Sequence, residues 1–377
     1  MLRRLFIRAC CILLLIPSML FGPLTLNADD LKGTDIAGHR ILKLYNEKNS
    51  AISLSNPLAI FEDRSGQYWI GTYGRVVLYD EKQDQWLTFA TKADGSRFRQ
   101  IETISQSIDN RLWVVTGGSA VEGKPNVSYF DGKLWQDPAA SPDSYTIKQP
   151  ITAMFSGRDG RIWAASKDEL IINSGQHWDP LIKLSELTGD DPPVRVRAGL
   201  QDSDGCVWLA TSEGIIKSDE RGRNWKIVDP IPQKADAGDE AEPSVYVRMA
   251  VSDGIYGMYE DRKGSIWFAS IAGPLGYHLV YDKKKYSWRY YQLAKHLPPS
   301  SSAGDGLGLT VIYHDKAGKL MFGTKIGLIT FDEALSKWEL FTPENSGLPG
   351  SSITAIFEDR SNRIWIGTNK GIVVLQQ

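Results

Sequence analysis

The fold follows from one stretch near the end of the chain, Ser352-Ile-Thr-Ala-Ile-Phe-Glu-Asp-Arg-Ser-Asn-Arg-Ile-Trp-Ile-Gly-Thr-Asn-Lys-Gly-Ile-Val-Val-Leu375. Its pattern is typical of two short apolar strands joined by a polar turn, then a glycine-containing turn and a third strand. Almost the same sequence occurs about three hundred residues earlier, as Ala59-Ile-Phe-Glu-Asp-Arg-Ser-Gly-Gln-Tyr-Trp-Ile-Gly-Thr72. The chain is therefore built from an internal repeat.

Seven copies of the repeat appear when each is anchored on the residue two positions before the glycine of Gly-Thr. Six anchors are Trp, and the sixth copy has Met in this place. Spacings between anchors run from 44 to 59 residues, the range in which one repeat forms one four-stranded propeller blade. The anchors are Trp69, Trp113, Trp163, Trp208, Trp267, Met321 and Trp365.

An acidic turn precedes every anchor. Asp, Asn and Gly suit a tight hairpin because their side chains bond nearby backbone or because they tolerate positive φ. The seven turns, most of which contain glycine, are Asp63–Gly66, Asp109-Asn110, Asp159-Gly160, Asp202–Gly205, Asp261–Gly264, Asp315–Gly318 and Asp359–Asn362.

The seventh copy has no fourth strand of its own, because the sequence stops at Gln377. Leu340–Ser346, the fourth strand and exit of copy six, aligns without gaps on Leu44–Ser50, ahead of copy one. Residues 40–47 are therefore expected to pair with the strand at 372–376. Such pairing closes the ring and removes the exposed sheet edges of an open array.

The sequence thus predicts an all-β protein, a single seven-bladed β-propeller at 29–377 that follows a signal peptide at 1–28. The N-terminal strand is expected to complete the last blade. The expected blades are 57–90, 101–136, 151–180, 196–228, 254–292, 307–342, and 351–377 with 40–47.

The first 28 residues have the features of a secretory signal. Arg3, Arg4 and Arg8 precede an apolar run that begins at Ala9, and Ala28 offers a small residue for cleavage. An uncleaved N-terminal anchor is the alternative, since the apolar run is long. Either outcome predicts a periplasmic or secreted protein that meets the membrane only through this segment.

The predicted mature chain has 40 Lys and Arg against 45 Asp and Glu, a net charge of −5. This balance argues against nucleic acid as a partner, because such binding needs a basic surface. Of the three cysteines in the chain, only Cys206 remains, so an intramolecular disulfide is excluded. A buried, inert thiol is expected at Cys206.

Several segments depart from the repeat. The glycines of Thr116–Pro125 predict a flexible loop, because no phosphate-binding signature follows them. Ser218–Trp225 approximates the Ser-x-Asp-x-Gly-x-x-Trp turn of sialidase-like propellers, with Glu220 in the Asp place, and predicts a folding element. The insertions at 229–252 and 293–303 are expected to join blades on the face that also carries the turns between second and third strands. Long loops on one face of a rigid scaffold favour binding there.

No catalytic or metal site is predicted. The five histidines are scattered without metal-ligand spacing, and no nucleophile elbow is present. An enzyme needs its acid or base once or twice, whereas the acids here recur in every blade, as turn residues do. No cofactor is predicted.

The differences between copies are the better guide to binding. Just after the Gly-Thr strand, the copies present a mixed but mostly basic set of side chains. If these positions surround the channel mouth, they could hold an anionic or polyhydroxyl ligand or a partner protein, although each is also compatible with an ordinary solvated loop. They are Tyr73, Arg75, Lys167, Glu213, Lys325, Asn369 and Lys370.

The pattern Ile-x-x-Ile-x-Glu-Asp-x-x-Gly-x-x-Trp-Ile-Gly-Thr-x-x-Gly-Ile/Leu resembles the two-component regulator propeller repeat. Ile60–Gly74 and Ile353–Ile372 carry it most fully, while Val115-Thr116 and Ala165-Ser166 replace Gly-Thr in copies two and three. The resemblance implies a periplasmic ligand-sensing propeller of the kind found ahead of a membrane histidine kinase. No kinase, cyclase or DNA-binding sequence follows the ring here, so signal output is expected to need a separate chain.

Two classes of function remain open. The first is a non-catalytic binding or sensor propeller that recognises an oligosaccharide, another small polar ligand, or a protein such as a histidine kinase. The second is a secreted carbohydrate-active or lyase-type propeller enzyme, which a carboxylate pair or a Tyr–Arg cluster at the channel mouth would favour. A purely structural assembly module is a third possibility.

Overall fold

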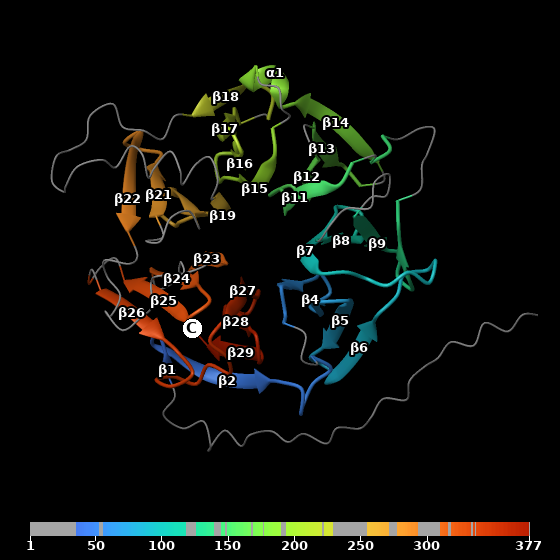
Figure 1. Ribbon diagram of the computed structural model, residues 1–377, viewed down its shortest axis with the longest axis vertical. Helices are drawn as coiled ribbons and strands as arrows, with labels where there is room; N and C mark the ends of the chain where they lie inside the picture. The colour runs from blue at the N-terminus through green and yellow to red at the C-terminus, as the bar shows by residue number, and fades with distance from the viewer. Residues whose placement is uncertain are drawn as a thin grey trace, which may run out of the picture.

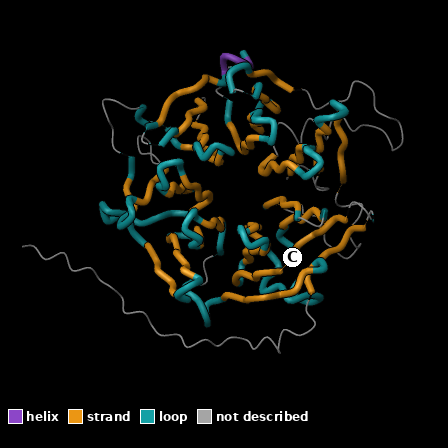
Figure 2. The backbone as a smooth tube through the Cα atoms, turned by 180° about the vertical axis from the view of Figure 1, so that it is seen from behind, coloured by secondary structure: helices purple, strands orange, loops and turns teal. Residues whose placement is uncertain are grey.

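The computed structural model describes residues 35–52, 56–117, 126–138, 145–147, 149–166, 169–175, 177–189, 194–220, 222–228, 255–270, 277–292, 310–315, 318–332, 335 and 337–376. Seven antiparallel sheets form a ring, as Figure 1 shows from one face and Figure 2 from the other. This arrangement confirms the predicted seven-bladed propeller. The predicted signal peptide lies outside the described residues.

Blades 1 to 4 are four-stranded, and each runs in chain order from the centre of the ring outward (Figure 1). A four-residue helix, α1 (Ser185–Thr188), follows blade 3. The strands are β3 (Ala59–Glu62), β4 (Tyr68–Thr72), β5 (Arg75–Asp80) and β6 (Gln85–Phe89); β7 (Ile101–Gln106), β8 (Leu112–Thr116), β9 (Val127–Phe130) and β10 (Trp135–Gln136); β11 (Ile151–Ser156), β12 (Ile162–Ser166), β13 (Glu169–Asn173) and β14 (Trp178–Lys183); β15 (Val196–Gln201), β16 (Val207–Thr211), β17 (Gly214–Ser218) and β18 (Trp225–Val228).

Blades 5 and 6 repeat this order, and blade 7 combines both ends of the described chain. The strands are β19 (Ile255–Glu260), β20 (Ile266–Ser270), β21 (Tyr277–Asp282) and β22 (Ser287–Gln292); β23 (Val311–His314), β24 (Lys319–Gly323), β25 (Leu328–Asp332) and β26 (Lys337–Phe341); and, in blade 7, β27 (Ile353–Glu358), β28 (Arg363–Thr368), β29 (Gly371–Gln376), β2 (His39–Tyr45) and β1 (Asp35–Ile36).

Closure of the ring follows the predicted register. β2 pairs antiparallel with β29, from Arg40 opposite Gln376 to Tyr45 opposite Ile372. The short strand β1 extends this sheet to five strands, which the sequence pattern did not predict.

The exits of the two aligned segments carry the same hydrogen bonds. Asn49 Nδ2 donates to the Leu44 carbonyl at 2.8 Å, and Asn345 Nδ2 donates to the Leu340 carbonyl at 2.9 Å. The hydroxyls one residue later, those of Ser50 and Ser346, each donate at 2.6 Å to the carbonyl four residues before them. β2 is therefore the fourth strand of blade 7 in its local chemistry as well as in its position.

The core is divided among the blade interfaces. Seven clusters of buried apolar side chains fill the seven interfaces, one cluster in each. Every anchor residue belongs to the cluster between its own blade and the next one, so Trp69 lies between blades 1 and 2 and Trp365 between blades 7 and 1. Because burial of such side chains is the main favourable term in folding, the anchors hold neighbouring blades together.

Candidate functional site

The repeated aspartate six residues before the anchor supports the fold of its own blade. In blade 7, Asp359 Oδ2 accepts from the Trp365 indole N–H, and Asp359 Oδ1 accepts from the Arg363 backbone N–H, both at 2.9 Å. Three other blades repeat the indole–carboxylate bond at 2.8 to 2.9 Å: Trp69 with Asp63, Trp208 with Asp202, and Trp267 with Asp261. These four carboxylates are buried and occupied.

The glutamate or glutamine one position earlier joins neighbouring blades. Glu62 in blade 1 accepts from the Arg360 backbone N–H in blade 7 at 2.7 Å. Equivalent bonds cross three further interfaces at 2.6 to 2.9 Å: Arg64 to Gln106, Arg158 to Gln201, and Ser203 to Glu260. Thus the Glu-Asp pair of the repeat connects one blade to the next and supports the anchor indole.

Blades 2 and 3 depart from this arrangement. Ser107 and Gly157 occupy the aspartate position, so the Trp113 indole donates to the Ser107 hydroxyl at 3.1 Å. The buried Trp163 indole N–H has no partner among the described residues. Asp109 and Asp159 lie in hairpin turns, as predicted, but both stand two residues later than the acids that accept the indole N–H in other blades. The count of residues back to the anchor distinguishes them in the sequence.

Blade 6 has Met321 as its anchor, which leaves Asp315 without an indole donor. His39 Nε2 of β2 lies 2.8 Å from Asp315 Oδ2, and both side chains are buried. Burial raises the pKa of Asp315, but the bonds from His39 and from the Lys319 backbone hold it below its ordinary value. The N-terminal strand thus supplies the polar partner that Trp supplies in other blades.

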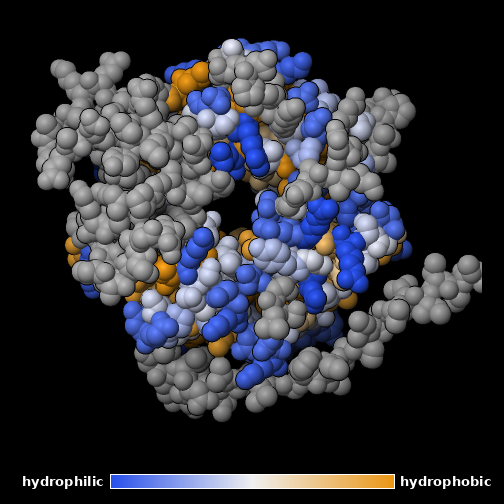
Figure 3. All heavy atoms as spheres, in the orientation of Figure 1, coloured by the Kyte–Doolittle hydropathy of each residue, from blue (hydrophilic) through white to orange (hydrophobic). Residues whose placement is uncertain are grey.

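A cavity of about 300 Å³ opens in the central channel between the inner strands of blades 2 to 5. Figure 3 shows the hollow at the centre of this face, with hydrophilic side chains along part of its border. The size is at the lower end of the range for small-ligand sites. The lining residues are Glu102, Thr103, Thr152, Ala153, Met154, Arg197, Ala198, Gly199, Gly257 and Met258.

A β-bulge presents one residue per blade to this channel. In five inner strands the register shifts at the position eleven residues before the anchor, which therefore has no cross-strand partner. Glu102, Thr152 and Arg197 occupy this position in blades 2, 3 and 4, and all three line the cavity. Sequence reasoning missed Glu102 and Arg197, because the bulge breaks the two-residue alternation by which strand faces are assigned.

Glu102 is the one carboxylate among the described lining residues of the cavity. Its side chain is exposed to the channel, yet protein lies around it on several sides. This partial burial raises the pKa of Glu102 above its ordinary value, and the charge of Arg195 opposes the rise. A carboxyl group that is poorly solvated in a cavity is a candidate for direct contact with a ligand.

Most of the described rim residues lie in the turns between second and third strands, and Arg75 begins the third strand of blade 1, β5. Glu213, Lys325 and Lys370 are exposed, and half of the Tyr73 side chain is exposed. None of the described rim residues lines the channel cavity. The structure therefore places these residues outside the inner strands, and their role in binding stays a prediction.

The other three rim candidates differ in their surroundings. Arg75 is half-buried, and its Nε has no partner in the described part of the chain. The Asn369 side chain caps its own blade by accepting from the Ser352 backbone N–H at 3.3 Å. Lys167 lies outside the described residues.

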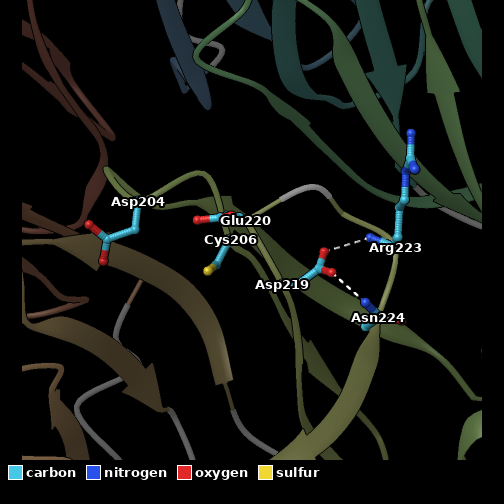
Figure 4. Close-up of a pocket in the computed structure, with 6 residues that line it drawn as sticks. All are labelled: Asp204, Cys206, Asp219, Glu220, Arg223 and Asn224. Carbon is cyan, nitrogen blue, oxygen red and sulfur yellow. Dashed lines mark hydrogen bonds between the residues drawn. The ribbon is translucent and has the colours of Figure 1, made fainter.

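A second, open pocket lies at the edge of blade 4 (Figure 4). It is bordered by the turn between β15 and β16 and by the turn between β17 and β18. Asp219 closes the turn at 218–225 by accepting from the Arg223 backbone N–H at 2.9 Å and from Asn224 Nδ2 at 2.6 Å. Cys206 borders this pocket, and burial raises the pKa of its thiol. The three carboxylates here give no site for a metal ion in the described residues.

Residues 52–74 and 347–370 match the model of the two component regulator propeller family. The matched segments lie in blades 1 and 7, on either side of the ring closure. The chain is therefore a seven-bladed propeller that carries two component regulator propeller repeats, as the sequence resemblance predicted. A search of the curated proteins found no match.

Several solved structures share the fold. The extracellular domain of the putative hybrid two component system BT4673 from B. thetaiotaomicron has a TM-score of 0.61 and 14% identity, over 89% of this chain and 40% of that one. Virginiamycin B lyase from Staphylococcus aureus, a catalytically inactive form with Quinupristin, has a TM-score of 0.60 and 13% identity, over 89% and 98%. At these identities the likeness shows the propeller fold alone.

A third structure, PorZ from Porphyromonas gingivalis, has a TM-score of 0.55 and 17% identity, over 82% of this chain and 45% of that one. The chain thus spans less than half of two of these three proteins. Within the described residues, no helix has the length and apolar character needed to cross a bilayer.

Proposed function

We propose that this protein is an exported, non-catalytic binding propeller of a signalling system, and that it recognises a small polar ligand at the channel. The observation that carries the proposal is the cavity of about 300 Å³ at blades 2 to 5, with Glu102 and Arg197 projecting from bulges of its wall. The repeated acids outside this cavity are engaged in structural bonds, which leaves the channel residues as the best candidates for recognition.

The signalling part of the proposal rests on two supports. The first is the match to the two component regulator propeller family. The second is the shared fold with the extracellular domain of BT4673, a putative hybrid two component system. We infer that output passes to a protein partner, such as a membrane histidine kinase.

Ligand binding can be tested by a thermal-shift screen of the purified protein against oligosaccharide acids, neutral oligosaccharides, amino acids and short peptides. A ligand that binds the folded protein raises the melting temperature by mass action. A shift without chemical change of the ligand is the expected result. If no class of compound shifts the melting temperature, recognition of a small ligand is excluded and a protein partner becomes the subject of the search.

Catalysis is the second candidate function, and one observation favours it: the raised pKa of Glu102 would suit a general acid. The described lining residues hold no second carboxylate or histidine to act with it. Mass spectrometry of each compound that shifts the melting temperature, before and after incubation with the protein, decides between the binding and the enzymatic function. Turnover that Glu102→Gln abolishes would replace the binding proposal with an enzymatic one.

Export can be tested separately by expressing the full chain and determining the N-terminus of the protein outside the cytoplasm. Cleavage after Ala28 gives a mature chain that begins at Asp29. Recovery of the intact N-terminus in the membrane fraction would show an anchor instead. Retention of the protein in the cytoplasm would overturn the proposed localisation.

A further inference from the structure

The bulge position facing the channel has a structural use on the far side of the ring. Thr310 of blade 6 donates its hydroxyl to the Ile353 carbonyl of blade 7 at 2.7 Å. Thr354 of blade 7 donates in the same way to the Pro57 carbonyl of blade 1. At this position, a threonine side chain therefore connects its blade to the inner strand of the next blade.

Blade 2 makes the same connection with a different residue. Asn126 of blade 2 donates from Nδ2 to the Ile151 carbonyl of blade 3 at 2.9 Å, and its Oδ1 accepts from the Ile151 backbone N–H at 2.7 Å. The bulge residue of blade 2, Glu102, is thereby released from the interblade role. A long ionised side chain in this place needs a reason other than ring assembly.

The cavity wall has opposite charges on two sides. Glu102 stands on the blade 2 side, while Arg197 lines the blade 4 side, and Arg195 of the same blade is close enough to influence Glu102 electrostatically. Met154 and Met258 provide apolar surface, and no aromatic side chain is among the described lining residues. This combination favours a compact ligand with a cationic group, an anionic group and an aliphatic part.

We propose that the channel cavity binds a small zwitterion, a free α-amino acid or a short peptide, with its ammonium group at Glu102 and its carboxylate at Arg197. The inference rests on the proposed binding function and names its ligand class. The methionines contact the aliphatic side chain, and Thr152 lies on the blade between the two charged ends.

The affinity for the zwitterion depends on pH through Glu102. Partial burial raises its pKa, and the charge of Arg195 in blade 4 opposes the rise. Arg197 is the other charged residue among the described lining residues of the cavity. Ionised Glu102 binds the ammonium group and protonated Glu102 does not. The affinity therefore falls as the pH is lowered through the raised pKa of Glu102, while a ligand without a cation shows no such fall.

The test is a calorimetric titration of the intact protein with leucine and leucyl-leucine. N-acetylleucine, which lacks the cation, and leucinamide, which lacks the carboxylate, are the matched compounds. Leucine or its dipeptide should bind at least tenfold more tightly than both, in line with the usual contribution of a charge-assisted bond. Glu102→Gln should remove the preference over N-acetylleucine, and Arg197→Gln the preference over leucinamide.

Lys82→Gln serves as the control, since Lys82 is exposed, does not line the cavity and is not a rim candidate; its affinity should equal that of the unaltered protein. Equal binding of leucine and N-acetylleucine would overturn the proposal, and so would failure of both zwitterions to bind at millimolar concentration. If oligosaccharide acids shift the melting temperature while the zwitterions do not, this ligand assignment fails and the proposed binding function stands.

Discussion

Blades 7 and 1 keep the residues of the repeat, which hold the ring together. Blades 2 to 4 have replaced some of these residues, and the inner strands of these blades line the channel cavity. On the first side, Trp365 is stacked against Tyr68, with ring centroids 4.3 Å apart, and against Tyr45 of β2 at 5.8 Å. On the second side, Trp163 has lost its carboxylate partner and Glu102 has replaced the threonine of the bulge. In this repeat protein, the residues that follow the repeat pattern hold the blades together, whereas the residues that depart from it are the candidates for a functional role.

Equivalent arginines give the largest expected contrast between the two sides. Arg363 donates to both Glu81 oxygens at 2.7 to 2.8 Å and to Asp359 at 2.7 Å, and it is mostly buried. Arg161 holds the same position in blade 3, but its pair with Asp159 is exposed. Arg363→Met should lower the free energy of unfolding by about 3 kcal/mol, because it leaves buried Asp359 without its cation and Glu81 with Lys43 alone.

Arg161→Met is the matched control and should cost about 0–1 kcal/mol, as exposed pairs do. Urea denaturation of the two variants measures both values. Equal losses of unfolding free energy in the two variants would show that the buried ion pairs at the ring closure contribute no more than the exposed pair in blade 3. That result would contradict the proposed difference between the two sides.

The anchors give the next contrast. Trp365→Phe removes an indole N–H that bonds buried Asp359, whereas Trp163→Phe removes an indole N–H without a described partner. Both changes lose similar apolar area, so the difference isolates the hydrogen bond. Trp365→Phe should be more destabilising by about 1–2 kcal/mol, measured as the difference in urea midpoint. A larger loss for Trp163→Phe would contradict this interpretation.

Acid should weaken the closure of the ring. Hydrogen bonds from Arg363, assisted by Lys43, lower the pKa of Glu81 from 4.5 to about 2. A lowered pKa in the folded state stabilises the protein above pH 4.5, and this contribution is lost as the pH falls toward 2. The loss should be roughly 1–2 kcal/mol after solvent screening, and Arg363→Met should remove most of this pH dependence.

The bulge threonines give a smaller contrast. Thr354→Val loses the bond to Pro57 across the closure, while Thr152→Val loses only a 3.3 Å bond to Ala165 within its own blade. We expect a loss of about 1 kcal/mol for the first variant and less for the second. Thermal unfolding at matched protein concentration compares them, and a larger loss for Thr152→Val would contradict the interblade role.

The smallest effect is expected at the cavity. Glu102→Gln should change the free energy of unfolding by less than about 0.5 kcal/mol, because the side chain has no structural hydrogen bond in the described residues. A large loss of stability would show that Glu102 supports the fold, and its place in the proposed site would then be lost.

The sequence predicts the ring well because the structural residues repeat. The distance from each anchor to its turn predicts the hairpins, and the alignment of Leu340–Ser346 with Leu44–Ser50 predicts the pairing of β2 with β29. The structure adds that Asn49 and Asn345 make equivalent side-chain bonds in the two segments. Each of these features occurs several times, so an error at one copy does not alter the fold.

The site was less predictable, for physical reasons. Glu102 and Arg197 reach the channel through a bulge, and an extra residue reverses the face that strand alternation assigns. Turn residues such as Lys325 were easier to identify, because loops can be recognised in a sequence by their composition. The described turn residues, however, do not line the cavity. The bond of His39 to Asp315 joins residues 276 positions apart and has no local signal at all.

The pairing of β2 with β29 also determines when the ring can close during synthesis. Arg40 and its partner Gln376 are 336 positions apart, so the first described blade strand must wait for the last one to be synthesised. The entropy of closing so long a loop grows only slowly with length, but contacts of this separation delay folding. Until β2 docks, β29 presents the apolar edge of Val373 and Val374 to other chains. The risk of aggregation is therefore greatest between the synthesis of β29 and the closure of the ring, when other chains compete with β2 for this edge.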